Sequence, residues 1–239
     1  MLIALLLVKL YLSSSEKIVC LSSIFFSMLN DITEIYRKIK PVIERRMEEF
    51  REIWEKGSEE DIFEELAFCL LTPQSKARIC WMAVERMKKN EVLLRGSYEE
   101  ILENLQGVRF KYTKAQNIIL AREFFMQEGK LSIRDKLKEF SNPWEMREYL
   151  VKNIRGIGYK EASHFLRNIG MGEKLAILDR HIMRNLRKLG VIGEIPRNLT
   201  RKKYLEIEEK MHAFCEEIGI PLAHFDLLLW YLETGFVFK

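Results

Sequence analysis

Glycine, proline and cysteine are scarce in this chain. Its 239 residues include 12 Gly, 5 Pro and 4 Cys, too few breakers for a collagen-like or low-complexity chain. The sequence has no stretch of strand length in which polar and apolar residues alternate, whereas Leu, Ile, Glu, Lys and Arg are abundant. Because these residues favour helices, the composition predicts an all-α protein. The length suits one or two domains.

The four cysteines are too scattered to form a known kind of site. None belongs to a CxxC pair, and an iron–sulfur cluster needs four clustered thiolates. Cys69 and Cys80 lie in apolar, helix-like stretches, which predicts buried free thiols. His164 and His181 have no acidic or cysteine neighbours at metal-ligand spacing, so we expect packing or hydrogen-bonding roles for them. The sequence therefore predicts no metal site.

Residues 1–27 differ from the rest of the chain. Two apolar runs, at 2–8 and 18–26, flank Lys9 and a polar, serine-rich stretch. No positive charge precedes the first run, as a signal peptide would require, and that run is too short to span a bilayer. We interpret residues 1–27 as an extension that is not native, with Met28 as the true start. A membrane anchor is the alternative, and we expect a cytoplasmic protein.

Apolar side chains recur at three- and four-residue spacings along most of the chain, which predicts a series of helices. The expected helices cover residues 31–56, 59–71, 75–89, 98–105, 114–128, 143–153, 160–169, 179–189, 202–217 and 222–233.

The segment LVKNIRGIGYKEASHF, at 150–165, is the most informative. A helix ends, a tight turn contains Gly156 and Gly158, and a second helix begins. Glycine permits positive φ and leaves backbone N–H groups uncovered. Because these groups lie at a helix N-terminus, they can bind one phosphate of a nucleic acid. A plain helix–helix turn is the alternative. The nine Lys/Arg and three Asp/Glu of residues 150–190 give this region a local charge excess of +6, which favours the phosphate.

Lys160 and Asp179 are the candidate catalytic residues. Lys160 lies in the first turn of the helix after the glycines, where the positive end of the helix dipole favours a neutral, nucleophilic amine. A surface lysine that contacts phosphate is the alternative. Asp179 precedes the next helix, where it is a preferred N-cap. A capping carboxylate can also stabilise developing positive charge, so both roles are compatible.

The stretches NIRGIGYKEASHFLRN (153–168) and LAILDRHI (175–182) resemble the helix-hairpin-helix DNA glycosylases, and among them the type 2 8-oxoguanine DNA glycosylase/lyases. The likeness extends over 28–239 and includes LLTPQSKAR (70–78), VRFKYTKA (108–115) and the tail FDLLLWYLETGFVFK (225–239). It implies a helical terminal subdomain (28–57 with 169–239) and a barrel-like subdomain with the hairpin (58–168), with the active site in the cleft between them.

The resemblance also implies the chemistry. Lys160 would form a Schiff base with the sugar, and Asp179 would stabilise the sugar cation. The substrate would be double-stranded DNA containing 8-oxoguanine, acted on by a monomer associated with the nucleoid. The reaction requires no cofactor, although a monovalent cation at the hairpin is common in the superfamily. Two alternatives stay open: an endonuclease III-like glycosylase for oxidised pyrimidines, and a non-catalytic DNA-binding module.

Further residues are expected to contact the DNA or the base. The family resembled uses a C-terminal lysine to tell 8-oxoguanine from guanine, which implies that role for Lys239. Trp230 or Phe225 would stack on the flipped base, and Asp226 would line the pocket, although core or capping roles are the alternatives. Residues expected to contact DNA or the orphaned base are Gly156, Gly158, Arg155 and Gln74, with Arg109, Lys111 and Lys114 as phosphate contacts or plain surface residues.

Overall fold

A computed structural model describes the backbone of residues 15–239 and the side chains of residues 29–239. The first fourteen residues of the predicted extension lie outside this range. Most of the described residues are helical, as predicted, and they form two compact units. We call Met47–Ile177 the hairpin unit, and the described residues up to Arg46 together with Leu178–Lys239 the terminal unit. These boundaries differ from the predicted 57/58 and 168/169, and the predicted subdomains stay a prediction.

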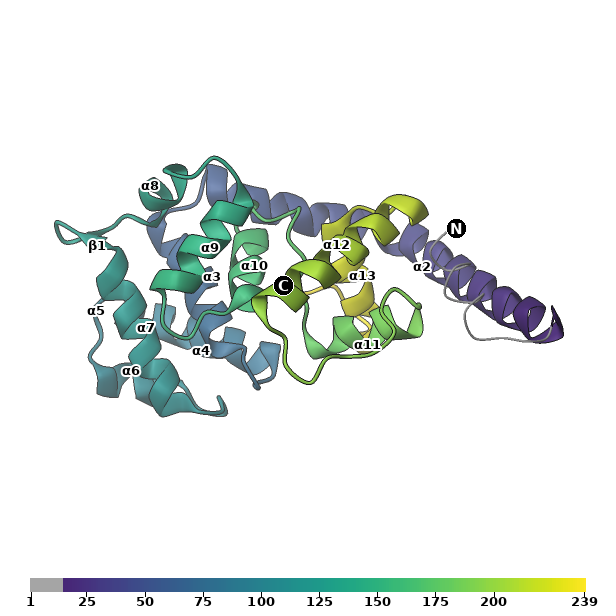
Figure 1. The fold of residues 1–239 in the computed structure, drawn as a ribbon. Coiled ribbons are helices and arrows are strands. Elements are labelled where there is room, and N and C mark those ends of the chain that lie inside the picture. Colours follow the sequence, from purple (N-terminus) through teal and green to yellow (C-terminus); the bar gives the residue numbers. More distant parts are fainter. Residues whose placement is uncertain (1–14) are drawn as a thin grey trace. The chain divides into compact units, whose positions relative to one another are not determined.

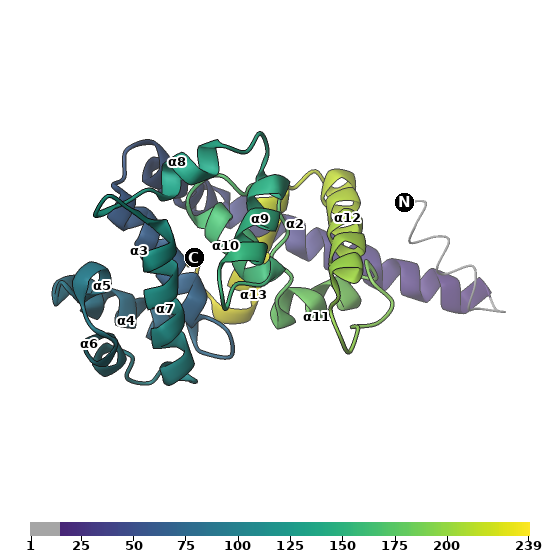
Figure 2. The same ribbon diagram turned by 60° about the vertical axis from the view of Figure 1, so that its left-hand side comes forward.

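The hairpin unit contains the end of α2 (Ser15–Glu55) and most of the other helices (Figure 1). They are α3 (Glu59–Leu71), α4 (Ala77–Lys89), α5 (Val92–Arg95), α6 (Tyr98–Asn104), α7 (Lys111–Phe125), α8 (Ile133–Lys138), α9 (Pro143–Asn153) and α10 (Tyr159–Asn168). Helix α10 packs against both α9 and α3, and α9 lies beside α10 in both views (Figure 2). This packing holds the turn between α9 and α10 on the body of the unit.

Side-chain caps explain where several of these helices begin. Ser58 accepts the N–H of Asp61, whose carboxylate in turn accepts the Ser58 N–H at 2.8 Å. Ser97 and Glu100 repeat this capping box at the start of α6. Such reciprocal bonds satisfy N–H groups that a helix leaves unpaired in its first turn. The predicted starts of these two helices, at residues 59 and 98, are confirmed.

The terminal unit contains the first part of α2 with α11 (Arg180–Lys188), α12 (Arg201–Ile218) and α13 (Leu222–Thr234). Both α11 and α12 pack against α13. Helix α2 begins at Ser15, well before the expected residue 31. The reason is the absence of helix breakers, since the first proline after Ser15 is Pro41 and the first glycine is Gly57.

One short hairpin was not expected. Helix α7 ends at Phe125 instead of continuing to Glu128, and β1 (Met126–Gln127) pairs antiparallel with β2 (Lys130–Leu131). Glu128 and Gly129 between them both have positive φ, 49° and 80°. A two-residue turn with both φ values positive matches the twist of paired strands. The short helices α5 and α8 were also missed.

Each unit has an apolar core. Phe63, Phe68, Phe125 and Phe165 are fully buried in the hairpin unit, and Ile43, Met211, Phe225 and Leu228 in the terminal unit. Within the described residues, no helix combines the length and the apolar character needed to cross a membrane.

Cys69, Cys80 and Cys215 are free and buried. For Cys69 and Cys80 this confirms the prediction. Burial raises the pKa of Cys80 to about 11 and that of Cys215 to about 12, and it also raises the pKa of Cys69. All three are therefore thiols and not thiolates at neutral pH.

Candidate active site

The turn from Ile154 to Gly158 joins α9 to α10 and has the predicted helix-hairpin-helix form. Its two isoleucines, Ile154 and Ile157, are buried and anchor it, and the Ile157 N–H donates to the Ile154 carbonyl at 3.2 Å. Gly156 has φ +90°, and a Cβ at this position would overlap the side-chain amide of Asn117. Glycine is therefore required here both by the backbone conformation and by the close approach of α7.

Gly158 is the N-cap of α10, and Lys160 lies in the first turn of that helix, as expected. The Lys160 Nζ is 2.8 Å from Oε1 of Glu161, and the two side chains are 22% and 13% exposed. Oε2 of Glu161 accepts the Gly158 N–H at 3.2 Å. A carboxylate thus lies directly beside the candidate nucleophile, a contact that the helix-dipole argument did not include. Glu161 was not among the predicted site residues, although a Glu three residues after a helix N-cap is a capping-box signal.

Lys114 does not face solvent. It is 5% exposed, and its Nζ donates to the carbonyl oxygens of Leu71 and Pro73, both at 2.7 Å, and to the Ser75 hydroxyl at 3.0 Å. Burial lowers the pKa of Lys114, and the nearby charges of Lys160 and Arg109 lower it further. The expectation that Lys114 contacts phosphate is wrong, because its ammonium is buried on the loop between α3 and α4.

That loop carries Gln74, which is exposed and has φ +56°. Gln74 belongs to a hydrogen-bonded turn, Thr72 to Ser75, that follows α3 directly, and α4 begins at Ala77. A non-glycine residue in this conformation costs energy, and such residues concentrate at functional sites. Phe110, at the start of α7, has φ +57° and is 56% exposed beneath the guanidinium of Arg109. Arg155, in the hairpin, is exposed.

Asp179 belongs to the terminal unit and is the N-cap of α11, as the capping interpretation predicts. Its Oδ1 accepts the Ile182 N–H at 2.8 Å, and its side chain is partly exposed. The cap uses only this oxygen, so Oδ2 is not needed to hold the helix end. An aspartate with one oxygen held by a backbone N–H is well oriented to stabilise a positive charge that develops beside its other oxygen.

His181 lies two residues after Asp179 on α11, and its ring meets that of Trp230 on the neighbouring helix α13 of the terminal unit. Their rings lie edge to face, with centroids 6.0 Å apart. Nδ1 of His181 is 3.5 Å from Oε2 of Glu233, whose other oxygen accepts Asn185 Nδ2 at 3.2 Å. The Asn185 hydrogen bond, with a smaller contribution from His181, lowers the pKa of Glu233. This cluster fixes one side of the Trp230 ring.

The other residues predicted for base recognition differ in exposure. Phe225 is fully buried against Phe214, with ring centroids 5.6 Å apart. Its ring has no exposed face, so Trp230, which is partly exposed, is the better candidate for stacking. Asp226 is buried on α13, and Lys239 is partly buried at the end of the chain. His164 packs edge-on against Phe68 with centroids 5.5 Å apart, in line with the predicted packing role.

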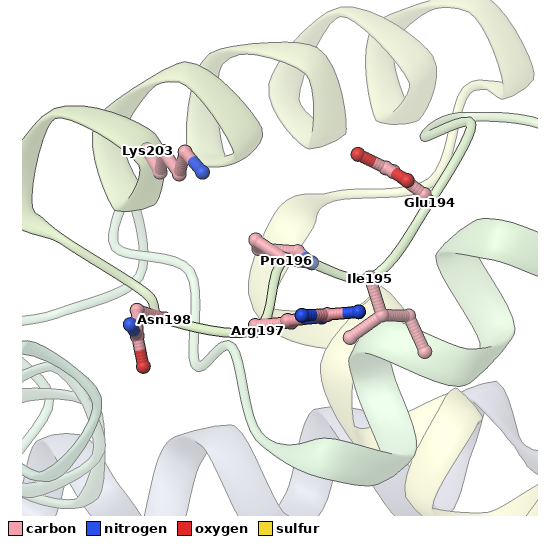
Figure 3. Close-up of a pocket in the computed structure, with 6 residues that line it drawn as sticks. All are labelled: Glu194, Ile195, Pro196, Arg197, Asn198 and Lys203. Carbon is pink, nitrogen blue, oxygen red and sulfur yellow. The ribbon is translucent and has the colours of Figure 1, made fainter.

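A pocket of about 340 Å³ lies in the terminal unit and contains none of the predicted site residues. Figure 3 shows Lys203 and Glu194 on either side of Pro196, with the pocket lined also by Ile195, Arg197 and Asn198. In the part of the chain that the structure describes, no three His, Cys, Asp or Glu side chains lie close enough together to hold a metal ion.

Residues 43–220 match the family model described as 8-oxoguanine DNA glycosylase. The chain belongs to this family. A relative from Fusobacterium nucleatum, called 8-oxoguanine DNA glycosylase/AP lyase, is 50% identical over 88% of this chain and 97% of its own length. A relative of the same name from Methanocaldococcus jannaschii is 44% identical over 84% of this chain and 94% of its own length.

Solved structures of the 8-oxoguanine DNA glycosylase family agree with the fold. The Thermotoga maritima enzyme has a TM-score of 0.80 and 40% identity, covering 90% of this chain and all of its own. The M. jannaschii glycosylase/lyase in complex with a 15mer DNA containing 8-oxoguanine has a TM-score of 0.81 and 40% identity, covering 89% of this chain and all of its own. The predicted family and the predicted helical fold are confirmed.

Proposed function

We propose that this protein is a DNA repair enzyme that excises 8-oxoguanine from double-stranded DNA and then nicks the strand. The observation that carries the proposal is membership of the 8-oxoguanine DNA glycosylase family over most of the chain, with a related structure bound to DNA containing 8-oxoguanine. This favours the main interpretation over an endonuclease III-like enzyme and over a non-catalytic DNA-binding module. We expect the enzyme to act as a monomer in the cytoplasm, on the DNA of the nucleoid.

The first step requires the damaged nucleotide to leave the stack, because its C1′ atom is unreachable within the duplex. The hairpin amides around Gly156 and Gly158 would grip a backbone phosphate, with Arg155 beside them. The bond from C1′ to the base then breaks, and its electron pair leaves with the base. Asp179, fixed by the Ile182 N–H, would stabilise the positive charge that develops on the sugar.

Neutral Lys160 would supply the nucleophile. Its lone pair forms a bond to C1′, the ring oxygen O4′ leaves and takes up a proton, and a protonated imine results. Loss of a proton from C2′ then expels the 3′ phosphate with the C3′–O bond electrons, which nicks the strand. Water hydrolyses the imine and regenerates the lysine. None of these steps uses a metal or organic cofactor. A monovalent cation at the hairpin carbonyls would assist phosphate binding only.

Recognition of the base would use the C-terminal region. Trp230 would stack on the extruded base, and Lys239 and Asp226 would contact the edge on which 8-oxoguanine and guanine differ. 8-Oxoguanine has an N7–H donor and a C8 oxygen acceptor that guanine lacks. One well-placed polar group can therefore distinguish the two bases. Gln74, on its strained turn, would contact the base left unpaired.

The test is a nicking assay on duplexes that contain 8-oxoguanine, thymine glycol or an abasic site, with borohydride added to trap an imine. We expect nicking of the 8-oxoguanine and abasic duplexes and a covalent adduct at Lys160, which Lys160→Gln abolishes. Preference for thymine glycol would support the endonuclease III-like alternative, and binding without any nicking would support the non-catalytic module.

A further inference from the structure

Glu161 contacts two groups on which the proposed reaction depends. One carboxylate oxygen accepts the Gly158 N–H at 3.2 Å, and the other lies 2.8 Å from the Lys160 Nζ. All three residues belong to the hairpin unit, and the Glu161 side chain is only 13% exposed. One carboxylate therefore joins the phosphate-binding turn to the nucleophile.

These two contacts oppose the reaction in the DNA-free protein. An ammonium has no lone pair, and a carboxylate at 2.8 Å stabilises the ammonium form of Lys160. The Gly158 N–H is a hairpin amide at the N-terminus of α10, where a DNA phosphate is expected to bind. While Glu161 accepts this N–H, its carboxylate occupies the position at which the negatively charged DNA phosphate would bind.

We propose that Glu161 is a positioning residue that latches Lys160 as an ion pair until DNA binds. A backbone phosphate that takes the Gly158 N–H displaces the carboxylate, and because both contacts belong to one side chain, Lys160 is released with it. The freed ammonium passes its proton to solvent, and its lone pair becomes available for C1′. The latch rests on the proposed function, since it assumes that Lys160 is the nucleophile.

The chain offers a matched control. Glu100 is the third residue of α6, and its carboxylate accepts the Ser97 N–H at 2.8 Å in the same way as Glu161 accepts that of Gly158. The residue before Glu100 is Glu99, whereas Lys160 precedes Glu161, so Glu100 has the capping bond without an adjacent lysine. Glutamine can take the third position of a capping box, so Glu→Gln keeps the cap and removes the charge.

The first arm measures the reactivity of the Lys160 amine in the DNA-free protein. Trace acetylation by acetic anhydride is followed by mass spectrometry, with the exposed Lys152 as internal reference. We expect labelling of Lys160 relative to Lys152 to rise on the order of tenfold in Glu161→Gln, because an adjacent carboxylate no longer holds the proton. In Glu100→Gln the ratio should stay within about twofold of wild type.

The second arm measures borohydride trapping in single turnover on a duplex with a preformed abasic site, at saturating DNA. Here Glu161→Gln and wild type should trap at rates within about threefold of each other, since a phosphate has displaced the carboxylate in the wild type. A purely structural role for Glu161 would lower trapping without raising labelling.

Two results would overturn the latch. Unchanged labelling of Lys160 in Glu161→Gln would mean that the carboxylate does not hold the amine. Trapping reduced by more than about tenfold would mean that Glu161 acts within the DNA complex. Wild-type protein that forms no adduct would instead refute the proposed lyase function, a result that the labelling arm does not depend on.

Circular dichroism checks that the variants fold. If Glu161→Gln does not, Glu161→Asp replaces it. Asp61 shows that an aspartate at the third position of a helix can accept the N-cap N–H. The shorter side chain should keep the cap and withdraw from Lys160, so the same rise in labelling is expected.

Discussion

The Lys114 ammonium donates to the Ser75 hydroxyl at 3.0 Å, and the same hydroxyl accepts the backbone N–H of Arg109. This pair ties the loop between α3 and α4 to the start of α7. Each of these loops carries an exposed residue with positive φ, Gln74 in one and Phe110 in the other. Two strained, exposed residues are thus held on loops that one buried cation connects.

Lys114→Met should destabilise the protein by about 1–3 kcal/mol, because the carbonyl oxygens of Leu71 and Pro73 lose their buried donor. Urea unfolding measures the change, and hydrogen exchange at residues 72–76 should become faster. Lys111→Met is the control, since among the described residues the Lys111 ammonium contacts only the exposed ring of Tyr112. Equal stability of the two variants would show that the Lys114 hydrogen bonds do not stabilise the loop between α3 and α4.

Asp179→Asn should reduce base release far more than DNA binding or stability. Asparagine caps a helix as well as aspartate does, so the bond to Ile182 can persist while the charge that stabilises the sugar cation is lost. Single-turnover excision, a binding titration and thermal unfolding separate these effects. Near-native excision would show that the carboxylate only caps α11.

Gly156→Ala should cost more stability than Gly129→Ala. Both glycines have positive φ, +90° and +80°, so both substitutions impose backbone strain of about 1 kcal/mol. At Gly129 nothing lies within 4 Å of an added Cβ, whereas at Gly156 an added Cβ would lie 2.2 Å from the Asn117 amide nitrogen. We expect the difference to reach about 1–3 kcal/mol in urea unfolding, with weaker DNA binding for Gly156→Ala only. Similar costs would show that the hairpin can move off α7.

Deletion of Lys239 should reduce the preference for 8-oxoguanine over guanine, whereas nicking of a duplex with a preformed abasic site, which has no base to recognise, should not change. The comparison is the ratio of kcat/KM for the two bases in matched duplexes. Lys210→Gln, which removes an exposed lysine from α12, controls for the loss of one positive charge. A preserved ratio in the deletion variant would remove Lys239 from the recognition site.

The sequence predicted the helical fold and most helix boundaries because periodic apolar residues and caps are local signals. Ser58 and Ser97 illustrate this, since each caps its helix by a bond to a residue three positions ahead. The β1–β2 hairpin and α5 were missed because they are two to four residues long, below the length at which periodicity is visible. The start of α2 was missed because the composition change at residue 28 was taken as a structural boundary.

The candidate site was predicted less completely. Gly156, Gly158, Lys160 and Asp179 stand at positions with a distinct local pattern, and their local structure is as expected. Lys114 was misplaced because its three acceptors come from residues 71–75, about forty positions earlier, and sequence spacing does not reveal such contacts. The burial of Phe225 likewise depends on Phe214 in another helix.

The protonated state of the three buried thiols has a consequence for an enzyme whose substrate arises by oxidation. Peroxides attack thiolates, and Cys69, Cys80 and Cys215 offer neither ionised sulfur nor access to solvent. The oxidants that create lesions in DNA would thus find these three sulfurs unreactive.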